Sequence, residues 1–207
     1  MQTVPLINRL LDSSAFKYKV ATKDWHPENH ISFASNHPEP NNKPFESFIT
    51  MKNVVANKPH ETHEQRLWPI HCVQGTEGAE LISELHKAKV NLIVEKGTDE
   101  RVEMYSAFSD SFGNQTAGKG GVTHDLAQRL RDKGITDVYC VGVAGDYCVN
   151  YSALDSAKAG FKTYLIEEGQ RCVDPETWPS VKEGLRNGKV EVISEHSEQV
   201  QKLLTSY

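Results

Sequence analysis

The fold is decided by the stretch Val138-Tyr-Cys-Val-Gly-Val-Ala-Gly-Asp-Tyr-Cys148-Val-Asn-Tyr-Ser-Ala153, in which an apolar segment runs directly into a helix start. Residues 138–143 are apolar and include three β-branched valines, which favours a strand buried on both faces of a parallel sheet. The glycines and the alanine that follow allow a sharp backbone turn, and a helix is expected to begin near Asp146. The order of strand, turn and helix is typical of an α/β protein.

Cys148 lies in the first turn of this expected helix. There a thiol feels the positive end of the helix dipole and nearby unpaired backbone N–H groups, so its thiolate is favoured and an oxyanion can be held beside it. That placement is typical of a nucleophile. A structural cysteine is the alternative, because free cysteine is among the most buried residue types. The stretch alone leaves both interpretations open.

The composition indicates a single domain over residues 1–207. Its 38% hydrophobic and 25% charged residues are ordinary for a globular protein of this length. The formal net charge of -5 comes without a basic block, so neither nucleic acid nor an anionic membrane is expected as a partner. No apolar run approaches the roughly 18 residues that span a bilayer, and no secretory signal follows Met1.

Cysteine usage favours a reducing compartment. The four cysteines, Cys72, Cys140, Cys148 and Cys172, show neither a C-x-x-C pair nor the spacing of a disulfide framework. Free thiols are typical of the cytosol. We therefore expect a cytoplasmic protein, with the nucleus and the peroxisome left open.

Outside this stretch, strand and helix patterns alternate along the chain. Strands are expected at 18–22, 90–94, 162–166 and 190–193, and helices at 4–11, 78–89, 124–133, 149–158, 177–186 and near the C-terminus. The alternation predicts a three-layer α/β/α sandwich with a mainly parallel sheet. Ligands bind such sheets at the carboxyl ends of the strands, and Asp24, Lys96 and Cys148 all follow strand ends.

Asp24 and His26 alternate just after the first expected strand, and His71 follows a rigid Trp-Pro pair. One carboxylate and two imidazoles with open positions are a common ligand set for Zn²⁺ or Fe²⁺. His30 is a candidate fourth ligand or a partner of the ligands. Chance pairing is the alternative, because the chain has nine histidines.

Residues 34–66 interrupt the alternation. They are polar and rich in Pro, Asn, His and Glu, without a sustained period. A loop of this length in a compact domain is usually a functional cover or a mobile insertion. We expect an insertion loop near the metal site.

Lys96 and three aromatic residues are further candidates for the site. An ammonium within about 4 to 6 Å of Cys148 would lower the pKa of the thiol by roughly 1 to 3 units, although a solvated lysine is the commoner case. Trp68, Tyr105 and Phe108 lie on expected loops, where they can stack on a flat aromatic substrate. Packing in the core is the alternative for all three.

Several segments carry the motifs of one family. They are Asp24-Trp-His26-Pro, Leu67-Trp-Pro-Ile-His71-Cys-Val, Glu95-Lys96-Gly97, Tyr105-Ser-Ala-Phe108, Gly142-Val-Ala-Gly-Asp-Tyr-Cys148-Val and Ala153-Leu-Asp-Ser-Ala-Lys-Ala-Gly-Phe-Lys-Thr163. Together they resemble the nicotinamidase/pyrazinamidase branch of the isochorismatase-like cysteine hydrolases. The resemblance covers nearly all of the chain, and the insertion before Trp68 is similar to that of fungal and other eukaryotic members.

The resemblance implies a metal-dependent substrate site. By it, Asp24, His26 and His71 bind one divalent metal, with Zn²⁺ preferred and Fe²⁺ or Mn²⁺ as alternatives. The remaining metal position takes the pyridine nitrogen of the small-molecule substrate, nicotinamide. Trp68 and Tyr105 line the pocket for the ring. The number of subunits is left open, a homo-oligomer included.

The resemblance also implies a covalent mechanism. Cys148 attacks the carboxamide carbon, and the backbone N–H groups of Ala144 and Cys148 form the oxyanion hole, with a cis peptide at Val143–Ala144. Lys96 stabilises the thiolate and the substrate. Ammonia leaves, a thioester forms, and water releases nicotinate, a step of NAD salvage.

One part of the family's machinery has no counterpart in these residues. The general base is an aspartate in a motif like D-x-Q-x-D-F at the end of a first strand, and we expect that strand to be absent here. Asp12 does not match, because it follows a helical Leu-Leu pair. Positioned acid–base catalysis contributes about 10² to 10⁴-fold, so slow hydrolysis is expected. The absent strand is central in the family's sheet, so its neighbours are expected to have unpaired edges.

Three interpretations follow from the resemblance. The first is an active amidase whose N-terminus was lost through a shortened gene model or an alternative start. The second is an inactive, metal- and nicotinamide-binding relative with a regulatory role. The third is another cysteine hydrolase of the same fold, such as an isochorismatase, against which Cys148, Lys96 and the metal cluster argue.

Overall fold

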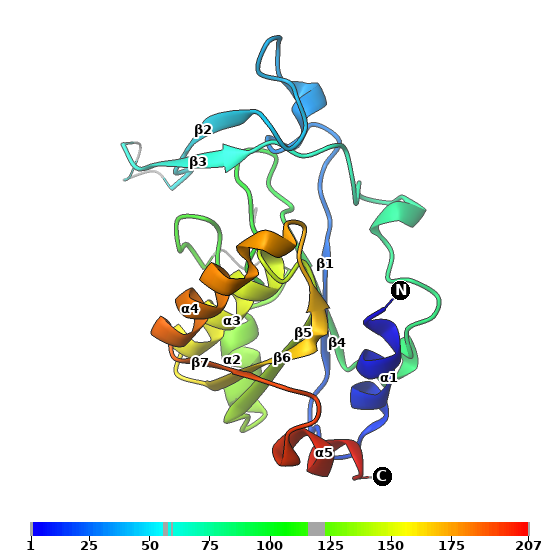
Figure 1. Cartoon of the computed structure of the whole chain (residues 1–207). Coiled ribbons are helices and arrows are strands. Elements are labelled where there is room, and N and C mark those ends of the chain that lie inside the picture. Colours follow the sequence, from blue (N-terminus) through cyan, green and yellow to red (C-terminus); the bar gives the residue numbers. More distant parts are fainter. Residues whose placement is uncertain (1, 56–57, 59, 116–122, 207) are drawn as a thin grey trace. The chain divides into compact units, whose positions relative to one another are not determined.

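The computed structural model describes residues 2–55, 58, 60–115 and 123–206 (Figure 1). Its contacts divide the chain into two compact units. The first unit comprises Met1–Ala21, Leu81–Ile93 and Leu126–Tyr207, and the second comprises Thr22–Glu80 and Val94–Asp125. A single domain over 1–207 stays a prediction.

The first unit contains a sheet of three parallel strands in the order β5, β6, β7. These strands are β5 (Asp137–Val143), β6 (Lys162–Arg171) and β7 (Val190–Ile193). The register pairs Leu165 with both Cys140 and Val192, so these three side chains point to one face of the sheet. Ile166 and Ile193, each one residue further on, point to the opposite face.

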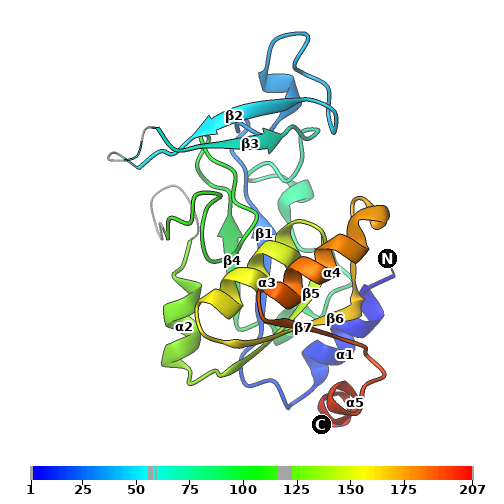
Figure 2. The same cartoon turned by 60° about the vertical axis from the view of Figure 1, so that its left-hand side comes forward.

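Helices cover both faces of this sheet (Figures 1 and 2). The face with Leu165 packs against α3 (Cys148–Lys158) and α4 (Trp178–Asn187). The face with Ile166 packs against α1 (Val4–Asp12) and α5 (Glu198–Leu204). Three layers result within this unit, and the predicted α/β fold with a mainly parallel sheet is confirmed.

The remaining helix of the first unit is α2 (Leu126–Asp132), which buries Leu126, Ala127 and Leu130. The longest helix, α3, has 11 residues. In the part of the chain that the structure describes, no helix has the length and apolar character needed to cross a bilayer.

The β5 strand is less buried than the sequence predicts. None of its residues is fully buried, and Val143 is 67% exposed. Leu165 and Ile166 of β6 have no exposed surface. Among the described strands β5 pairs only with β6, whereas β6 lies between two neighbours. Both faces of β5 pack against an apolar cluster, but the strand is only partly buried, so the expected full burial is wrong. One of its edges has no described strand beside it.

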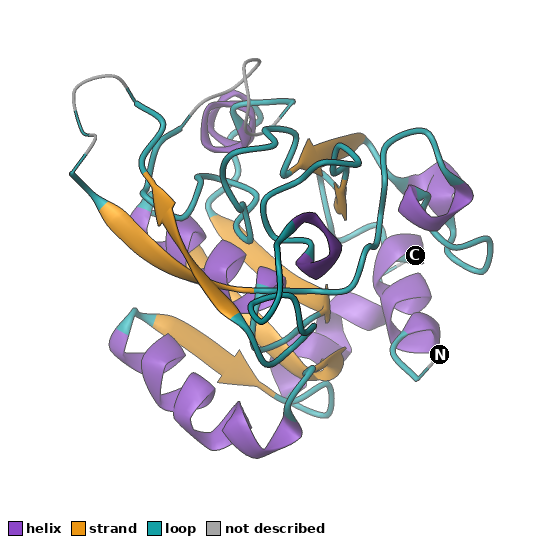
Figure 3. Cartoon of the chain, turned by 90° about the horizontal axis from the view of Figure 1, so that it is seen from above, coloured by secondary structure: helices purple, strands orange, loops and turns teal. Residues whose placement is uncertain are grey.

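The second unit carries a hairpin and the ends of two paired strands. The hairpin consists of β2 (Phe48–Lys52) and β3 (Thr62–Arg66), which pair antiparallel (Figure 3). The other two strands, β1 (Val20–Asp24) and β4 (Leu92–Lys96), pair with each other. They run parallel, because the Asn91 N–H donates to the Lys19 carbonyl near their start and the Trp25 N–H donates to the Lys96 carbonyl at their end. Both strands thus end on a residue predicted for the site.

Two sequence predictions need correction here. The helix expected at 78–89 is absent, and the segment contains only the short 3-10 turns Glu77–Ala79 and Lys87–Lys89. Its apolar residues, Leu81, Ile82 and Leu85, are only partly buried, and a helix this short is marginal without a packed face. The insertion at 34–66 is not loop throughout, because it contains the β2–β3 hairpin.

Candidate active site

Two backbone segments flank Asp24 and His26 in the second unit. On one side the Trp25 N–H donates to the Lys96 carbonyl at 2.9 Å. On the other side the His26 N–H donates to the Cys72 carbonyl at 3.0 Å, and the Gln74 N–H donates to the His26 carbonyl at 2.8 Å. The strand end therefore lies between β4 and the segment that follows His71, which brings together motifs far apart in the sequence.

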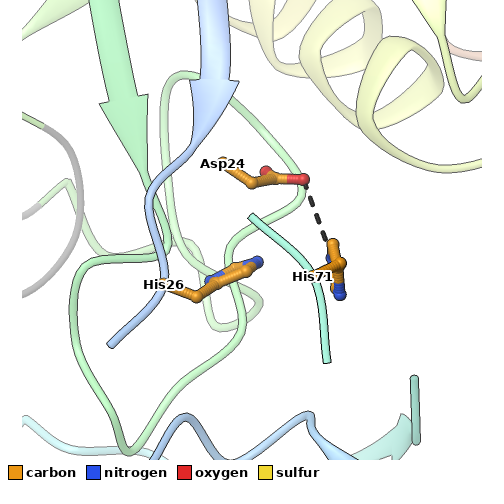
Figure 4. A group of neighbouring side chains, drawn as sticks. All are labelled: Asp24, His26 and His71. Carbon is orange, nitrogen blue, oxygen red and sulfur yellow. Dashed lines mark ion pairs between the residues drawn. The ribbon is translucent and has the colours of Figure 1, made fainter. Parts of the chain in front are cut away.

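Asp24, His26 and His71 form a compact cluster of metal-binding groups (Figure 4). One donor atom from each lies within 4.8 Å of the donors of the other two. The His71 Nε2 atom lies 3.9 Å from Asp24 Oδ2. His26 is 1% exposed, whereas the side chains of His71 and Asp24 are 35% and 21% exposed. The cluster therefore combines one buried ligand candidate, His26, with two that solvent reaches in part, His71 and Asp24.

The histidine tautomers in this cluster fit a metal. His26 Nδ1 lies 2.9 Å from the Gly97 carbonyl, and His71 Nδ1 lies 2.8 Å from the Pro69 carbonyl. A carbonyl only accepts hydrogen bonds, so each Nδ1 donates, and in the neutral imidazole that a metal binds each Nε2 has its lone pair available. Such a carbonyl partner is the usual support of a metal-binding histidine. The residues present thus match an ion with nitrogen and oxygen ligands.

Gly97 has a structural role beside His26. Its φ is +66°, a conformation that favours glycine, and a Cβ atom there would lie 2.4 Å from His26 Cε1. The chain after β4 can therefore approach the imidazole closely enough for the Gly97 carbonyl to accept a hydrogen bond from His26 Nδ1.

Lys96 is buried and paired rather than solvated. It is 2% exposed, and its Nζ donates to Asp24 Oδ1 and, at 3.2 Å, to the Met104 carbonyl. Burial alone raises the pKa of Asp24, but the charges of Lys96 and of the two histidines outweigh that effect and hold the pKa below its ordinary value. Asp24 therefore stays ionised, with one oxygen on Lys96 and the other facing His71.

His30 supports the cluster without being placed as a ligand. It is fully buried, and its ring centroid lies 4.1 Å from that of His26. The Ser32 N–H donates to its Nδ1 at 3.3 Å, and its Nε2 lies 3.2 Å from the Val102 carbonyl. Burial lowers the pKa of His30 to about 4. Although His26, His30 and Glu103 also form a close set of buried donors, both nitrogens of His30 are engaged by the protein.

The aromatic candidates are in the same unit. Trp68 and Phe108 are 8% and 7% exposed, which is core-like burial. The Trp68 and Tyr105 rings meet edge to face at a centroid distance of 6.4 Å, and Trp68 Nε1 donates to the Tyr105 hydroxyl at 2.9 Å. Gln65 Nε2 donates to the same hydroxyl at 2.6 Å. Sequence reasoning missed Gln65, because a glutamine in a polar segment without a period gives no signal.

In the first unit, Cys148 is the first residue of α3 and is partly exposed. The peptide between Val143 and Ala144 is cis, as the resemblance implies. The structure thus places the thiol at a helix start, as predicted. Lys96 and the metal cluster belong to the second unit, so their approach to Cys148 stays a prediction.

Asp146, whose hydrogen bonds stabilise the turn before Cys148, was not identified from the sequence. Its carboxylate accepts the N–H groups of Val173 and Asp174 at 2.9 and 2.8 Å. The Gly145 N–H donates to the Arg171 carbonyl at 2.8 Å. The turn is therefore attached to the segment that follows β6. Only its position two residues before Cys148 could have signalled this.

Comparison with known proteins decides the family. A model of the isochorismatase domain matches residues 33–197. The chain belongs to the isochorismatase family. Within that family it is 39% identical to a nicotinamidase of Acinetobacter baylyi over 84% of this chain and 71% of the relative.

Solved structures of this family place the chain in its nicotinamidase/pyrazinamidase branch. The yeast nicotinamidase bound to the inhibitor nicotinaldehyde has a TM-score of 0.82 and 32% identity, covering 93% of this chain and 87% of that one. A Pyrococcus horikoshii pyrazinamidase in complex with zinc has a TM-score of 0.65 and 31% identity, covering 93% and 85%. The chain is therefore a hydrolase that acts on amide carbon–nitrogen bonds.

Proposed function

We propose that this hydrolase converts nicotinamide to nicotinate and ammonia in NAD salvage. The observation that carries the proposal is the cluster of Asp24, His26 and His71 beside a buried Lys96, all placed by the motifs that the resemblance identifies. The identity to the Acinetobacter baylyi nicotinamidase supports the same substrate. Lys96 and the metal cluster argue against an isochorismatase-type substrate.

We assign Asp24 Oδ2, His26 Nε2 and His71 Nε2 as the ligands of one divalent metal. Zinc is the preferred ion, because nitrogen and oxygen donors with an open position suit it and because a related pyrazinamidase is described in complex with zinc. When bound, the metal supplies a Lewis-acidic position for the pyridine nitrogen. Trp68 and Tyr105 then border the ring.

Cys148 is the proposed nucleophile. Its thiolate attacks the carboxamide carbon and forms a tetrahedral oxyanion, which the N–H groups of Ala144 and Cys148 stabilise. The carbon–nitrogen bond breaks, the amide nitrogen takes up the proton that the thiol gave up, ammonia leaves, and a thioester remains. Water then adds to the thioester carbon and releases nicotinate and the thiol. Lys96 stabilises the negative charge of the thiolate and of the intermediate.

The proton acceptor in this scheme rests on the resemblance alone. The family's aspartate stands in a D-x-Q-x-D-F motif, which does not occur within the 207 residues. The alternative function is that of a relative which binds metal and nicotinamide without turning the amide over. Without a positioned acid–base group, hydrolysis is expected to be about 10² to 10⁴-fold slower.

Metal analysis and an ammonia assay test the proposal together. We expect the purified chain to hold one divalent ion, and Asp24→Ala and His71→Ala to lose it. Cys148→Ala should keep the ion and lose ammonia release from nicotinamide. A chain that binds no metal, with both ligand variants behaving like the parent, would remove the metal assignment. Binding of metal and nicotinamide without ammonia release, both in this chain and in the same chain preceded by a strand with the D-x-Q-x-D-F motif, would favour the alternative function.

A further inference from the structure

The Tyr105 hydroxyl is held by two donors from one short stretch of the chain. Gln65 Nε2 donates to it at 2.6 Å and Trp68 Nε1 donates to it at 2.9 Å. A phenol oxygen has two acceptor positions, so these two bonds fix the direction of the hydroxyl. Both donors lie in the second unit together with Tyr105. The position of the phenol is thus set by the chain that runs from β3 to Trp68.

Gln65 has little freedom of its own. It is 1% exposed on β3, and its Nε2 also donates to the Arg66 carbonyl at 2.6 Å. On β2 the buried Met51 lies on the same face of the hairpin, and the Glu103 N–H donates to its sulfur at 3.2 Å. The inward face of the hairpin therefore contacts the segment from Glu103 to Tyr105 at two points.

The same segment is attached to the metal cluster from its other side. The Met104 carbonyl accepts a hydrogen bond from Lys96 Nζ, and Lys96 also pairs with Asp24. The hydroxyl of Tyr105 is thus bonded to the hairpin through Gln65, and the carbonyl of the residue before it is bonded to Lys96 of the cluster. A shift of the hairpin would be transmitted to the phenol ring through one buried amide.

We propose that Gln65 is a positioning residue for the aromatic substrate ring. Through its hydrogen bond to Tyr105 it sets the angle between the Tyr105 and Trp68 rings, so the β2–β3 hairpin shapes the binding site for a flat heteroaromatic carboxamide. This inference rests on the proposed function, because it takes Trp68 and Tyr105 as the walls of the ring pocket. It gives the polar insertion at 34–66 a direct role in substrate selection.

A double-mutant cycle in equilibrium binding tests this role. Gln65→Met removes the donor and keeps the side-chain length, and Tyr105→Phe removes the acceptor and keeps the ring. Loss of one buried hydrogen bond corresponds to about a 5- to 20-fold weaker Kd for nicotinamide. We expect Gln65→Met to show that loss and Tyr105→Phe to show at least that loss, because it also removes the hydrogen bond from Trp68. The double variant should bind no more weakly than Tyr105→Phe, because Tyr105→Phe already removes the interaction that Gln65→Met removes.

The matched control is Glu64→Met. Glu64 is the exposed neighbour of Gln65 on the same strand and points to the opposite face, so it should bind like the parent. The near-UV circular dichroism of the unliganded chain gives a second readout, since a changed angle between the Trp68 and Tyr105 rings alters it in Gln65→Met but not in the control. If Gln65→Met fails to fold, Gln65→Leu replaces it, because an alkyl side chain can neither donate a hydrogen bond to the Tyr105 hydroxyl nor accept one from it.

The outcomes separate this inference from the proposed function. Gln65→Met binding like the parent, or losses that multiply in the double variant, would overturn the role of Gln65 even if the parent hydrolyses nicotinamide. A coupled loss of binding in a parent that releases no ammonia even when preceded by a strand with the D-x-Q-x-D-F motif would keep the role of Gln65 and overturn the proposed hydrolysis. A parent that binds neither nicotinamide nor nicotinate would overturn both.

Discussion

Lys96 and Asp24 form a pair whose members depend on each other. The Lys96 side chain is 3% exposed and that of Asp24 is 21% exposed. Removing one partner of such a pair leaves an uncompensated charge, which costs about 3 to 5 kcal/mol. We therefore expect Lys96→Met to lower the free energy of unfolding, measured in urea with chelator present, by about 3 kcal/mol.

The double variant Lys96→Met/Asp24→Asn is the control for this pair. It removes both charges, so it should regain most of the stability lost in Lys96→Met. A single variant as stable as the parent would show that the pair contributes nothing to the fold. A double variant that loses more stability than Lys96→Met alone would contradict the coupling between the two charges.

His30 gives the molecule a pH dependence of known sign. Burial lowers its pKa from 6.5 to about 4 in the folded chain. Between these values the unfolded chain binds more protons, so the stability contributed by the neutral imidazole is present above pH 6.5 and is lost as the pH falls toward 4. The loss should reach about 3 kcal/mol, and unfolding titrations from pH 7 to 4 measure it. His30→Asn should flatten this slope, and a parent whose stability is constant over that range would refute the assignment.

The start of α3 depends on one carboxylate. Asp146 accepts two backbone N–H groups of the segment after β6, and each such group costs about 1 to 3 kcal/mol when buried without a partner. We expect Asp146→Ala to lose about 2 to 4 kcal/mol of stability and to react more slowly with iodoacetamide at Cys148, because the turn that holds the thiol loosens. Asp146→Asn keeps one acceptor oxygen, so its stability and its alkylation rate should lie between those of the parent and those of Asp146→Ala. Alkylation and unfolding like those of the parent in Asp146→Ala would contradict this role.

Elements with a packed apolar face were predictable from the sequence. The last strand, Val190–Ile193, lies where its apolar pattern predicts it. The first helix was predictable because Leu6 and Leu10 form a buried face at helical spacing. It ends one residue later than predicted. At 78–89 the same spacing failed, since Leu81 and Leu85 have no covering layer and are only partly buried. The β2–β3 hairpin was missed because backbone pairing, rather than apolar alternation, defines strands such as Thr62–Arg66.

The candidate site was predictable where a motif fixes local geometry. Asp24 and His26 follow from a strand end, whereas His71 was a weaker candidate that rested on the rigid Trp-Pro pair before it and on the resemblance, because no period relates residues so far apart. Gln65 and Asp146 could not be predicted, since their roles depend on partners that the fold brings close. The approach of Lys96 to Cys148 remains a prediction, because the two residues belong to different units.

Ammonia release from nicotinamide tests the central claim most directly. It would be measured for the 207-residue chain and for the same chain preceded by a strand with the D-x-Q-x-D-F motif, each with and without Cys148→Ala. We expect all release to depend on Cys148, and the longer chain to be about 10² to 10⁴-fold faster. Equal release with and without the thiol would contradict the amidase mechanism.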